Sequence, residues 1–216
     1  MELSVELQRQ LATLDIRVDT DDIEKLLALL EQLLHWNRTY NLTAITDPLE
    51  AIEKHLVDSL TLLPHLGQAE TLIDIGSGAG FPALPLKIVR PDLKVISVDS
   101  VAKKINFQKH VVRKLQLENF IAWHGRAEEL SQQVFLADKA DLVVARAFSS
   151  LPKLLDLALP CLKLGGRVIA MKGPEGESEL RAIEGRLKKT GVECQDRILL
   201  TLPVSGSVRQ LLVFGC

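Results

Sequence analysis

The chain has 216 residues, of which 47% are hydrophobic and 25% charged, and its formal net charge at pH 7 is −2. This is the composition of a globular protein with a full hydrophobic core, so it excludes a largely disordered chain. Since no apolar run is long enough to span a bilayer and the first residues lack the pattern of a secretory signal, we expect a cytoplasmic protein without membrane contact.

Residues 1–66 are expected to form an N-terminal helical extension. From Leu26 onward, leucines recur at three- and four-residue spacing, which predicts a helix with one buried face. The segment 35–43 is rich in Asn and Thr, so it is expected to interrupt this helix with a turn. Pro48 suits the first turn of a following helix, which is expected to end near Pro64.

Residues 67–216 alternate short apolar runs with helical segments, which indicates one core domain. The runs that predict strands are 71–75, 94–98, 119–123, 141–145, 166–171, 193–200 and 210–214. The segments between them that predict helices are those ending near residue 89 and spanning about 102–115, 127–131, 151–159 and 175–189. Such alternation is typical of a Rossmann-like α/β fold, in which helices cover both faces of a seven-stranded, mostly parallel sheet.

A glycine-rich loop follows the first predicted strand. Here Asp74 is followed by Gly76, Gly78 and Gly80, so the backbone can turn tightly and approach a ligand at the end of the strand. The GxGxG spacing, with Phe81 next, differs from the GxGxxG fingerprint of dinucleotide-binding proteins. The Asp74 carboxylate would repel a pyrophosphate but would pair with an ammonium group. S-adenosylmethionine (SAM) has an ammonium group and no phosphate, so the loop favours SAM as the ligand.

Two further acidic residues follow the next two predicted strands. Asp99 lies 19 residues after Gly80, where a carboxylate can accept hydrogen bonds from the ribose hydroxyls of NAD or SAM. After the third strand, the backbone of Ala127 and the carboxylate of Glu128 can meet an adenine edge. The alternative for both acids is a structural role at the start of a helix.

The kind of methyl transfer is limited by what the sequence lacks. The fourth predicted strand ends in Ala145-Arg146-Ala147-Phe148, and not in the Asn/Asp-Pro-Pro-aromatic tetrapeptide common in enzymes that methylate exocyclic amines of bases. Cytosine C5 chemistry needs a cysteine nucleophile, but Cys161 lies in a Leu-rich segment typical of a small buried residue. An acceptor such as guanine N7 has a free lone pair and needs no general base, so proximity and orientation would supply the catalysis.

The net charge conceals an asymmetry along the chain. Residues 1–70 carry 5 Lys and Arg against 13 Asp and Glu, a net of −8, whereas residues 71–216 carry 21 against 15, a net of +6. The basic part favours a polyanion such as RNA, although two solvated surfaces that differ by chance give the same numbers. Arg146 and Lys172 follow strands at the ligand edge and are the candidate catalytic residues. The other basic residues that could contact phosphates are Lys103, Lys104, Lys109, Arg113, Lys114 and Arg126. The alternative is an ordinary solvated helix face, which is favoured for Lys109 and Lys114.

Metal chemistry and two other classes of protein fit these features less well. Cys161, Cys194 and Cys216 form no CxxC pair, so neither a zinc site nor a disulfide framework is expected, and no metal is predicted. An NAD-dependent oxidoreductase is disfavoured by the loop spacing and by Asp74. A non-catalytic RNA-binding or assembly protein that keeps SAM as a structural ligand is the remaining alternative.

Several motifs together resemble the bacterial 16S rRNA guanine-N7 methyltransferase family, RsmG, also called GidB. They are the segments 36–44, 55–60 (His-Leu-Val-Asp-Ser-Leu), 74–82, 99–100, 126–128, 146–149 and 171–173. The glycine loop alone indicates only a superfamily. The Asn-rich segment, the His-x-x-Asp-Ser motif and the Arg-Ala-Phe strand end are far more specific, and the resemblance covers nearly the whole chain.

The resemblance implies a class I SAM-dependent methyltransferase fold with an N-terminal helical cap. It implies SAM as donor, S-adenosylhomocysteine as product, and a guanine in the decoding-region loop as acceptor. The partner would be 16S rRNA or the small ribosomal subunit, and we expect a monomer. Carried over by position, the SAM contacts are Gly76, Phe81, Ala127, Glu128 and Arg146. The family commonly has Leu at position 81, so Phe81 is a departure that affects the shape of the pocket.

Two roles are open for four polar residues of the N-terminal part. They are Asn37, Asn41, His55 and Asp58. They can shape the mouth of the ligand pocket, or they can cap and brace the helices that carry them. A single histidine on an otherwise apolar helix face is more often structural than catalytic.

Overall fold

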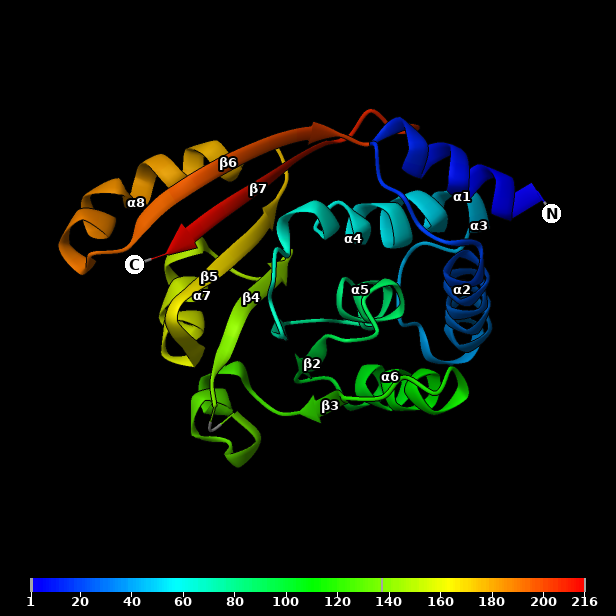
Figure 1. Cartoon of the computed structure of the whole chain (residues 1–216), viewed down its shortest axis with the longest axis horizontal. Coiled ribbons are helices and arrows are strands. Elements are labelled where there is room, and N and C mark those ends of the chain that lie inside the picture. Colours follow the sequence, from blue (N-terminus) through cyan, green and yellow to red (C-terminus); the bar gives the residue numbers. More distant parts are fainter. Residues whose placement is uncertain (1, 137, 216) are drawn as a thin grey trace.

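A computed structural model describes residues 2–136 and 138–215 as an α/β fold around one seven-stranded sheet (Figure 1). The strands are β1 (Thr71–Ile75), β2 (Lys94–Asp99), β3 (Phe120–His124), β4 (Ala140–Arg146), β5 (Leu162–Lys172), β6 (Glu193–Thr201) and β7 (Val208–Gly215). Their order is β3-β2-β1-β4-β5-β7-β6. Strands β1 to β5 pair in parallel, whereas β7 runs antiparallel to both β5 and β6. The predicted seven-stranded, mostly parallel sheet is confirmed.

Helices cover both faces of this sheet. They are α1 (Glu2–Thr13), α2 (Thr20–Tyr40), α3 (Pro48–Ala51), α4 (Asp58–Leu60), α5 (Ala83–Val89), α6 (Ala102–Lys114), α7 (Leu151–Ala158) and α8 (Gly176–Thr190). A π-helical turn, Ile52–Val57, joins α3 to α4, and 3₁₀ segments span Leu63–His65, Ala127–Gln132, Val134–Leu136 and Leu159–Cys161. No helix in the described part of the chain is both long and apolar enough to cross a membrane.

Neighbouring residues of a strand serve two different cores. Leu72 of β1 packs with α5, α6 and the N-terminal helices, whereas the next residue, Ile73, packs with α7 and α8. This follows from strand geometry, because successive side chains point to opposite faces of a sheet. Both faces are apolar, so Leu72, Ile73 and Ile75 are all fully buried, as in a parallel strand covered on both sides.

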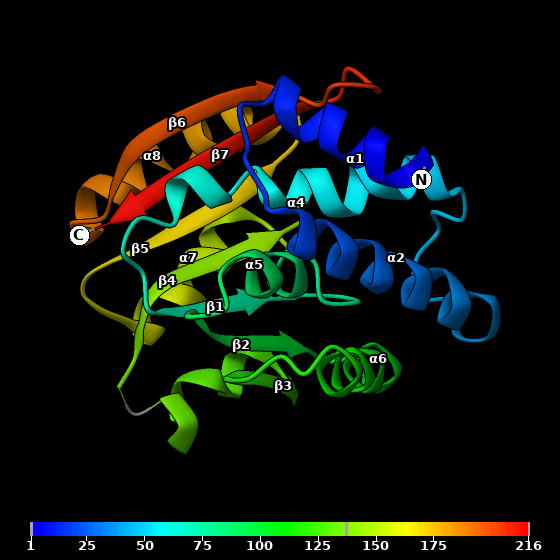
Figure 2. The ribbon, with the colours of Figure 1, turned by 45° about the vertical axis from the view of Figure 1, so that its right-hand side comes forward.

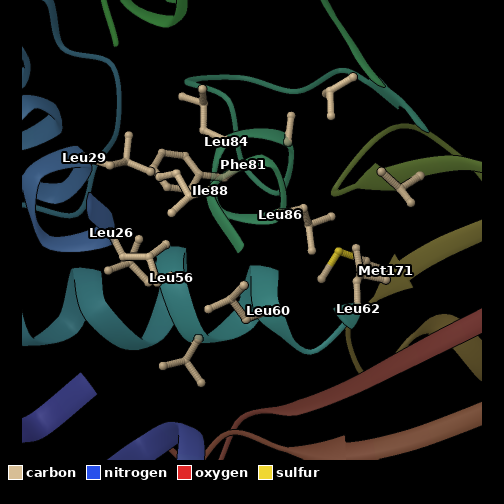
Figure 3. Packing of buried hydrophobic residues seen from close by; sticks show 14 of the residues in the cluster. Leu26, Leu29, Leu56, Leu60, Leu62, Phe81, Leu84, Leu86, Ile88 and Met171 are labelled. Carbon is tan, nitrogen blue, oxygen red and sulfur yellow. The ribbon is translucent and has the colours of Figure 1, made fainter. Parts of the chain in front are cut away.

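The N-terminal helices share one core with the sheet. Figure 3 shows Leu26 and Leu29 of α2 facing the same buried space as Leu56, Leu60 and Leu84. All five side chains are fully buried. Burying side chains of this size stabilises the fold by about 1.5–3 kcal/mol each, so the helices attach firmly to the core domain.

Helix α2 continues through the segment in which a turn was predicted. Residues 35–40 are helical, and the helix ends at Asn41, which has the left-handed conformation typical of a helix end. The Asn37 side chain accepts hydrogen bonds from the backbone N–H groups of Leu42 and Thr43, at 2.6 and 2.9 Å. The prediction of a break across 35–43 was therefore wrong, because these polar side chains cap the end of the helix and do not interrupt it.

The structure describes two of the three cysteines, and both are free. Cys161 is buried, and burial raises the pKa of its thiol to about 11, so it is not poised as a nucleophile. Cys194 is a second free cysteine, and Cys216 lies outside the described residues. No group of three or more His, Cys, Asp or Glu residues is placed to hold a metal within residues 2–136 and 138–215.

Candidate methyl-donor and acceptor sites

The glycine loop lies at the carboxyl end of β1. Gly76, Gly78 and Gly80 have φ angles of +71°, +59° and +93°, a region that side chains other than glycine rarely adopt. The backbone N–H groups of Gly76 and Ser77 both donate to the carbonyl of Val98, which ties the loop to β2. A Cβ atom at Gly76 would collide with the Phe148 ring. The loop therefore needs glycine for its backbone turn and for the close approach of Phe148.

A cavity of about 780 Å³ opens beside this loop, above the carboxyl ends of β1, β2 and β3. Four of the candidate SAM residues line it: Gly76, Asp99, Ala127 and Glu128. The other lining residues are Val98, Ser100, Val101, Lys104, His124, Gly125, Arg126, Glu129, Phe148 and Lys153. We call this cavity the donor pocket. Its size and position are those of a ligand site in an open α/β sheet.

Asp99 and Glu128 combine a structural role with a place in the donor pocket. The Asp99 carboxylate accepts a hydrogen bond from the Gly78 N–H at 2.8 Å and another from the Val101 N–H at 2.8 Å. It therefore fastens the glycine loop to the end of β2. Glu128 is exposed, its Oε1 lies 3.2 Å from Lys153 Nζ, and its pKa is lowered by a hydrogen bond from its own backbone and by Lys153.

Asp74 is fully buried beneath the loop and does not line the donor pocket. Its Oδ2 accepts a hydrogen bond from the Ala83 N–H at 3.1 Å, whereas its Oδ1 has no partner among the described residues. Burial raises the pKa of this carboxyl to about 7, although the Ala83 hydrogen bond and the Arg146 charge act in the opposite direction. The unpartnered oxygen is a buried acceptor that does not line the donor pocket, so its contact with an ammonium group stays a prediction.

A second cavity, of about 530 Å³, lies beside the segment that joins β4 to α7, on the side away from the donor pocket. It is lined by Ile45, Lys54, His55, Asp58, Arg146, Ala147, Ser149, Met171, Lys172, Gly173, Glu179 and Arg209. We call it the acceptor pocket. Ala147 and Ser149 have φ angles of +52° and +37°, and they line this pocket while Phe148 between them lines the donor pocket. The unusual backbone thus makes residues 147–149 the wall between the two pockets.

A buried carboxylate links three parts of the chain at the acceptor pocket. Asp58 Oδ2 lies 3.2 Å from Arg146 Nη1, and Asp58 Oδ1 lies 2.9 Å from Arg209 Nε. Arg146 also donates to the Lys54 carbonyl at 2.8 Å. Arg146 ends β4, Arg209 belongs to β7, and Asp58 begins α4, so this ion-pair network holds the helical part against the sheet.

His55 lines the acceptor pocket and packs against Phe81. Their rings stack with centroids 4.8 Å apart, and the Arg146 guanidinium carbon lies 5.9 Å from the Phe81 centroid. His55 Nε2 lies 3.1 Å from Thr43 Oγ1, and burial together with the charges of Arg146 and Lys54 lowers the histidine pKa to about 3. The ring is therefore neutral at physiological pH and is not a proton shuttle there.

Lys172 supports the wall between the pockets. Its Nζ donates to the Ser149 carbonyl at 2.9 Å and to Glu179 at 2.8 Å, and Glu179 in turn accepts a hydrogen bond from the Leu151 N–H. The lysine is 9% exposed, so only a small part of it faces the acceptor pocket.

The structure thus divides the predicted site residues between two pockets. Gly76, Asp99, Ala127 and Glu128 line the donor pocket; Arg146 and Lys172 line the acceptor pocket; Asp74, Gly78, Gly80 and Phe81 line neither. Sequence reasoning did not include Arg209 or Glu179. Arg209 had a signal, because it is a charged residue two positions before the apolar run 211–214. Glu179 had none, because it lies in a helix that is polar on most positions.

A model of the GidB family, described as rRNA small subunit methyltransferase G, matches residues 22–201. The chain belongs to this family. Proteins from Geobacter sp. (strain M21) and Syntrophotalea carbinolica, both named ribosomal RNA small subunit methyltransferase G, are 46% and 47% identical to it. These matches cover 97% and 96% of this chain and 95% of each relative. The resemblance stated from the motifs is confirmed.

Solved structures agree in fold. A SAM-dependent methyltransferase from Aquifex aeolicus matches with a TM-score of 0.58 and 20% identity, over 79% of this chain and 94% of that one. The tRNA methyltransferase TrmK from B. subtilis matches with a TM-score of 0.59 and 17% identity, over 76% and 67% of the two chains. At these identities the likeness concerns the fold alone, and it confirms the predicted class I SAM-dependent methyltransferase architecture.

Proposed function

We propose that this GidB-family chain transfers a methyl group from SAM to N7 of a guanine in the decoding-region loop of 16S rRNA. The observation that carries the proposal is the donor pocket, which lies at the carboxyl ends of three parallel strands beside a GxGxG loop. It occurs in a chain whose relatives are named for methylation of small-subunit rRNA.

The residues of the donor pocket suit the parts of SAM. Asp99 faces the pocket, and a carboxylate has lone pairs beyond the two that accept the Gly78 and Val101 N–H groups, so it can also accept from ribose hydroxyls. Ala127 and Glu128 can meet the adenine edge. Asp74 would accept a hydrogen bond from the ammonium group through its unpartnered Oδ1. Bound SAM supplies an electrophilic methyl group on its sulfonium.

The acceptor pocket suits a guanine because cations line it, among them Arg146, Lys172 and Arg209. Arg146 Nη1 is engaged by Asp58 and Lys54, which leaves the other guanidinium nitrogens for guanine O6, for a phosphate or for the carboxylate of SAM. Lys172 holds residues 147–149 in place. Guanine N7 carries no proton, so the chain needs only to orient its lone pair toward the methyl group. The lowered pKa of His55 makes its ring a weak base, which agrees with chemistry that needs no base.

The substrate is 16S rRNA, either free or within the small ribosomal subunit. Both pockets are lined by a single chain, so we propose that a monomer suffices for the reaction. We place this activity in the cytoplasm, where the small subunit is assembled and used, without a role for membranes.

The test combines the product with a binding control. The purified chain is incubated with methyl-labelled SAM and small subunits from cells that lack this gene, and the digested RNA is analysed for labelled nucleosides. We expect label in 7-methylguanosine at one rRNA position, and no label with Gly76→Ala, whose new methyl group meets the Phe148 ring. SAM binding without methylation of subunits, assembly intermediates or free rRNA would favour a non-catalytic role.

A further inference from the structure

A third cavity, of about 820 Å³, lies on the N-terminal helices outside the two pockets described above. Its walls are α1, the region from Asp47 through the π-helical turn, and the turn between β6 and β7. Figures 1 and 2 both show the β6–β7 turn beside α1, although the two are almost 200 residues apart along the chain. We call this cavity the N-terminal groove.

The N-terminal groove is both acidic and apolar. Five acidic residues line it against one base, Lys54; the acids are Glu2, Glu6, Asp47, Glu50 and Glu53. Glu6 pairs with Arg9 beside the groove and Glu50 pairs with Lys54, so the net charge with Arg9 included is −3. Between them stand Val5, Leu49 and Val204, which are 60%, 47% and 58% exposed. Large apolar side chains that lie exposed together in a groove are a feature of binding surfaces.

One buried polar group of the groove lacks a partner. Gln10 is 1% exposed, and its Nε2 donates to Glu6 Oε1 at 2.7 Å. This contact fixes the orientation of the amide, since the nitrogen must face the carboxylate. The Gln10 Oε1 is then left without a donor among the described residues. A buried acceptor without a partner is costly, so a bound group that brings an N–H donor would stabilise it.

The groove is also held in shape by the chain itself. Buried Glu53 accepts hydrogen bonds from the backbone N–H groups of Val204 and Ser205, at 2.5 and 2.9 Å. These bonds fix the β6–β7 turn against the helices. A preformed groove loses less entropy when it binds a partner than a mobile one does.

The groove adjoins the acceptor pocket. Lys54 lines both, and its carbonyl accepts the hydrogen bond from Arg146. A partner in the groove would therefore lie next to the place where the acceptor guanine enters. RNA itself is an unsuitable occupant, because phosphates would be repelled by a surface with a net negative charge.

We propose that the N-terminal groove binds a Lys- and Arg-rich amphipathic segment of a protein that is itself bound to rRNA. Proteins that pack against rRNA carry such segments because they neutralise phosphates. The apolar side chains of the segment would cover Val5, Leu49 and Val204, and its cations would face the acidic rim. This inference rests on the proposed function, and it means that the chain recognises a protein of the ribonucleoprotein particle as well as the RNA.

The test compares two sets of charge-neutralising substitutions. The groove variant is Glu2→Gln/Glu6→Gln/Glu50→Gln. The control variant removes three exposed acids outside the groove and carries Glu24→Gln, Glu31→Gln and Glu118→Gln. Binding is measured without SAM for three probes: small ribosomal subunits, protein-free 16S rRNA, and a fluorescein-labelled amphipathic peptide of lysine, leucine and alanine.

For the groove variant we expect Kd to rise about tenfold for the subunits and the peptide, with no change for protein-free rRNA. The control variant should bind all three probes as the unsubstituted chain does. An unchanged peptide Kd, an equal loss in both variants, or an equal loss on protein-free rRNA would overturn the proposal. So would a dimer that the groove variant dissociates, because the occupant would then be a second copy.

The outcome is separable from that of the methylation test, because these assays measure binding and need no SAM. If the subunits are bound through the groove but no 7-methylguanosine forms, the proposed reaction fails and the groove stands. If 7-methylguanosine forms and groove substitutions change no Kd, the reaction stands and the groove proposal fails.

Discussion

At the scale of single residues, Asp74 of the donor site is buried, which favours its neutral form, whereas pairing with an ammonium group requires its charged form. Asp74 must be buried beneath the glycine loop, where its Oδ2 binds the Ala83 N–H. Burial without a cation favours the protonated acid, and the pKa is accordingly raised to about 7. A bound ammonium would reverse this preference, so we expect SAM binding and ionisation of Asp74 to be coupled.

The way in which the stability of the ligand-free chain depends on pH should reveal the raised pKa of Asp74. The unfolded chain releases the Asp74 proton near pH 4, whereas the folded chain holds it until about pH 7. The free energy of unfolding therefore loses a contribution as pH rises through that range. Asp74→Asn should remove this loss, so that the variant is more stable than the unsubstituted chain at pH 8 and gains less at pH 5. Urea denaturation at both pH values measures the difference.

Comparing the unsubstituted chain with Asp74→Asn separates the effect of Asp74 on stability from that of His55, which has the opposite dependence on pH. The pKa of His55 is lowered to about 3 in the folded chain, so its contribution to stability is lost as pH falls from about 6.5 toward 3. This contribution is present in both proteins and cancels in their difference. Equal dependence of stability on pH in both proteins would show that Asp74 keeps an ordinary pKa.

At the scale of elements, the acceptor pocket depends on contacts between β4, β7 and the N-terminal helices. No one element builds it, because Asp58, Arg146 and Arg209 come from three. The carboxylate of Asp58 is buried between two guanidinium groups, and a buried charge is stable only when it is paired. Arg209 thus fixes Asp58, which in turn orients Arg146 toward the pocket.

Removal of Arg209 should affect both stability and the reaction. We expect Arg209→Ala to lower the free energy of unfolding by about 1–2 kcal/mol, because Asp58 loses one charged hydrogen bond. The methylation rate should fall about tenfold as Arg146 loses its fixed orientation. Arg209→Lys should recover part of that rate.

The matched control is Arg197→Ala, since Arg197 is an exposed arginine of the neighbouring strand β6. It should change neither quantity. Loss of stability in Arg209→Ala with an unchanged methylation rate would mean that Arg209 braces the fold without positioning Arg146.

At the scale of the whole molecule, opposite charges lie on different parts of the chain. The N-terminal helices are acidic, whereas Lys104, Arg126 and Lys153 stand around the donor pocket. Lys103 is not part of this cationic rim, because its Nζ donates to the carbonyls of Tyr40 and Asn41. The distribution favours approach of RNA from the pocket side and of a cationic partner from the helical side.

The salt dependence of rRNA binding measures this arrangement. We expect log Kd for protein-free 16S rRNA to rise with log salt concentration, and Lys104→Gln/Arg126→Gln to lower the slope by about 0.7 for each charge that contacts a phosphate. Lys188→Gln/Lys189→Gln, on the exposed end of α8, is the matched control and should keep the slope. Equal slopes for all three proteins would place the RNA elsewhere on the surface.

Local patterns in the sequence determined the fold class, the seven strands, the glycine loop and the acids at the strand ends. Each of these features leaves a mark within a short stretch of chain. Strands buried within the sheet appear as apolar runs, and the left-handed turns at 76, 78 and 80 appear as glycines. The same local reasoning failed at residues 35–40, because Trp36 packs against Phe107 and His110 of α6 and the helix continues beneath them.

Only the tertiary structure decided how the site residues are divided between two pockets. The pairing of Asp58 with Arg209, 151 positions later, depends on β7 inserting between β5 and β6, which no local pattern specifies. The backbone of Ala147 and Ser149 is left-handed where the Phe148 ring approaches Gly76, and Arg146 at the end of β4 reaches Asp58 of α4. These arrangements arise from packing between distant segments, whereas sequence patterns report mainly on which face of its own element a residue occupies.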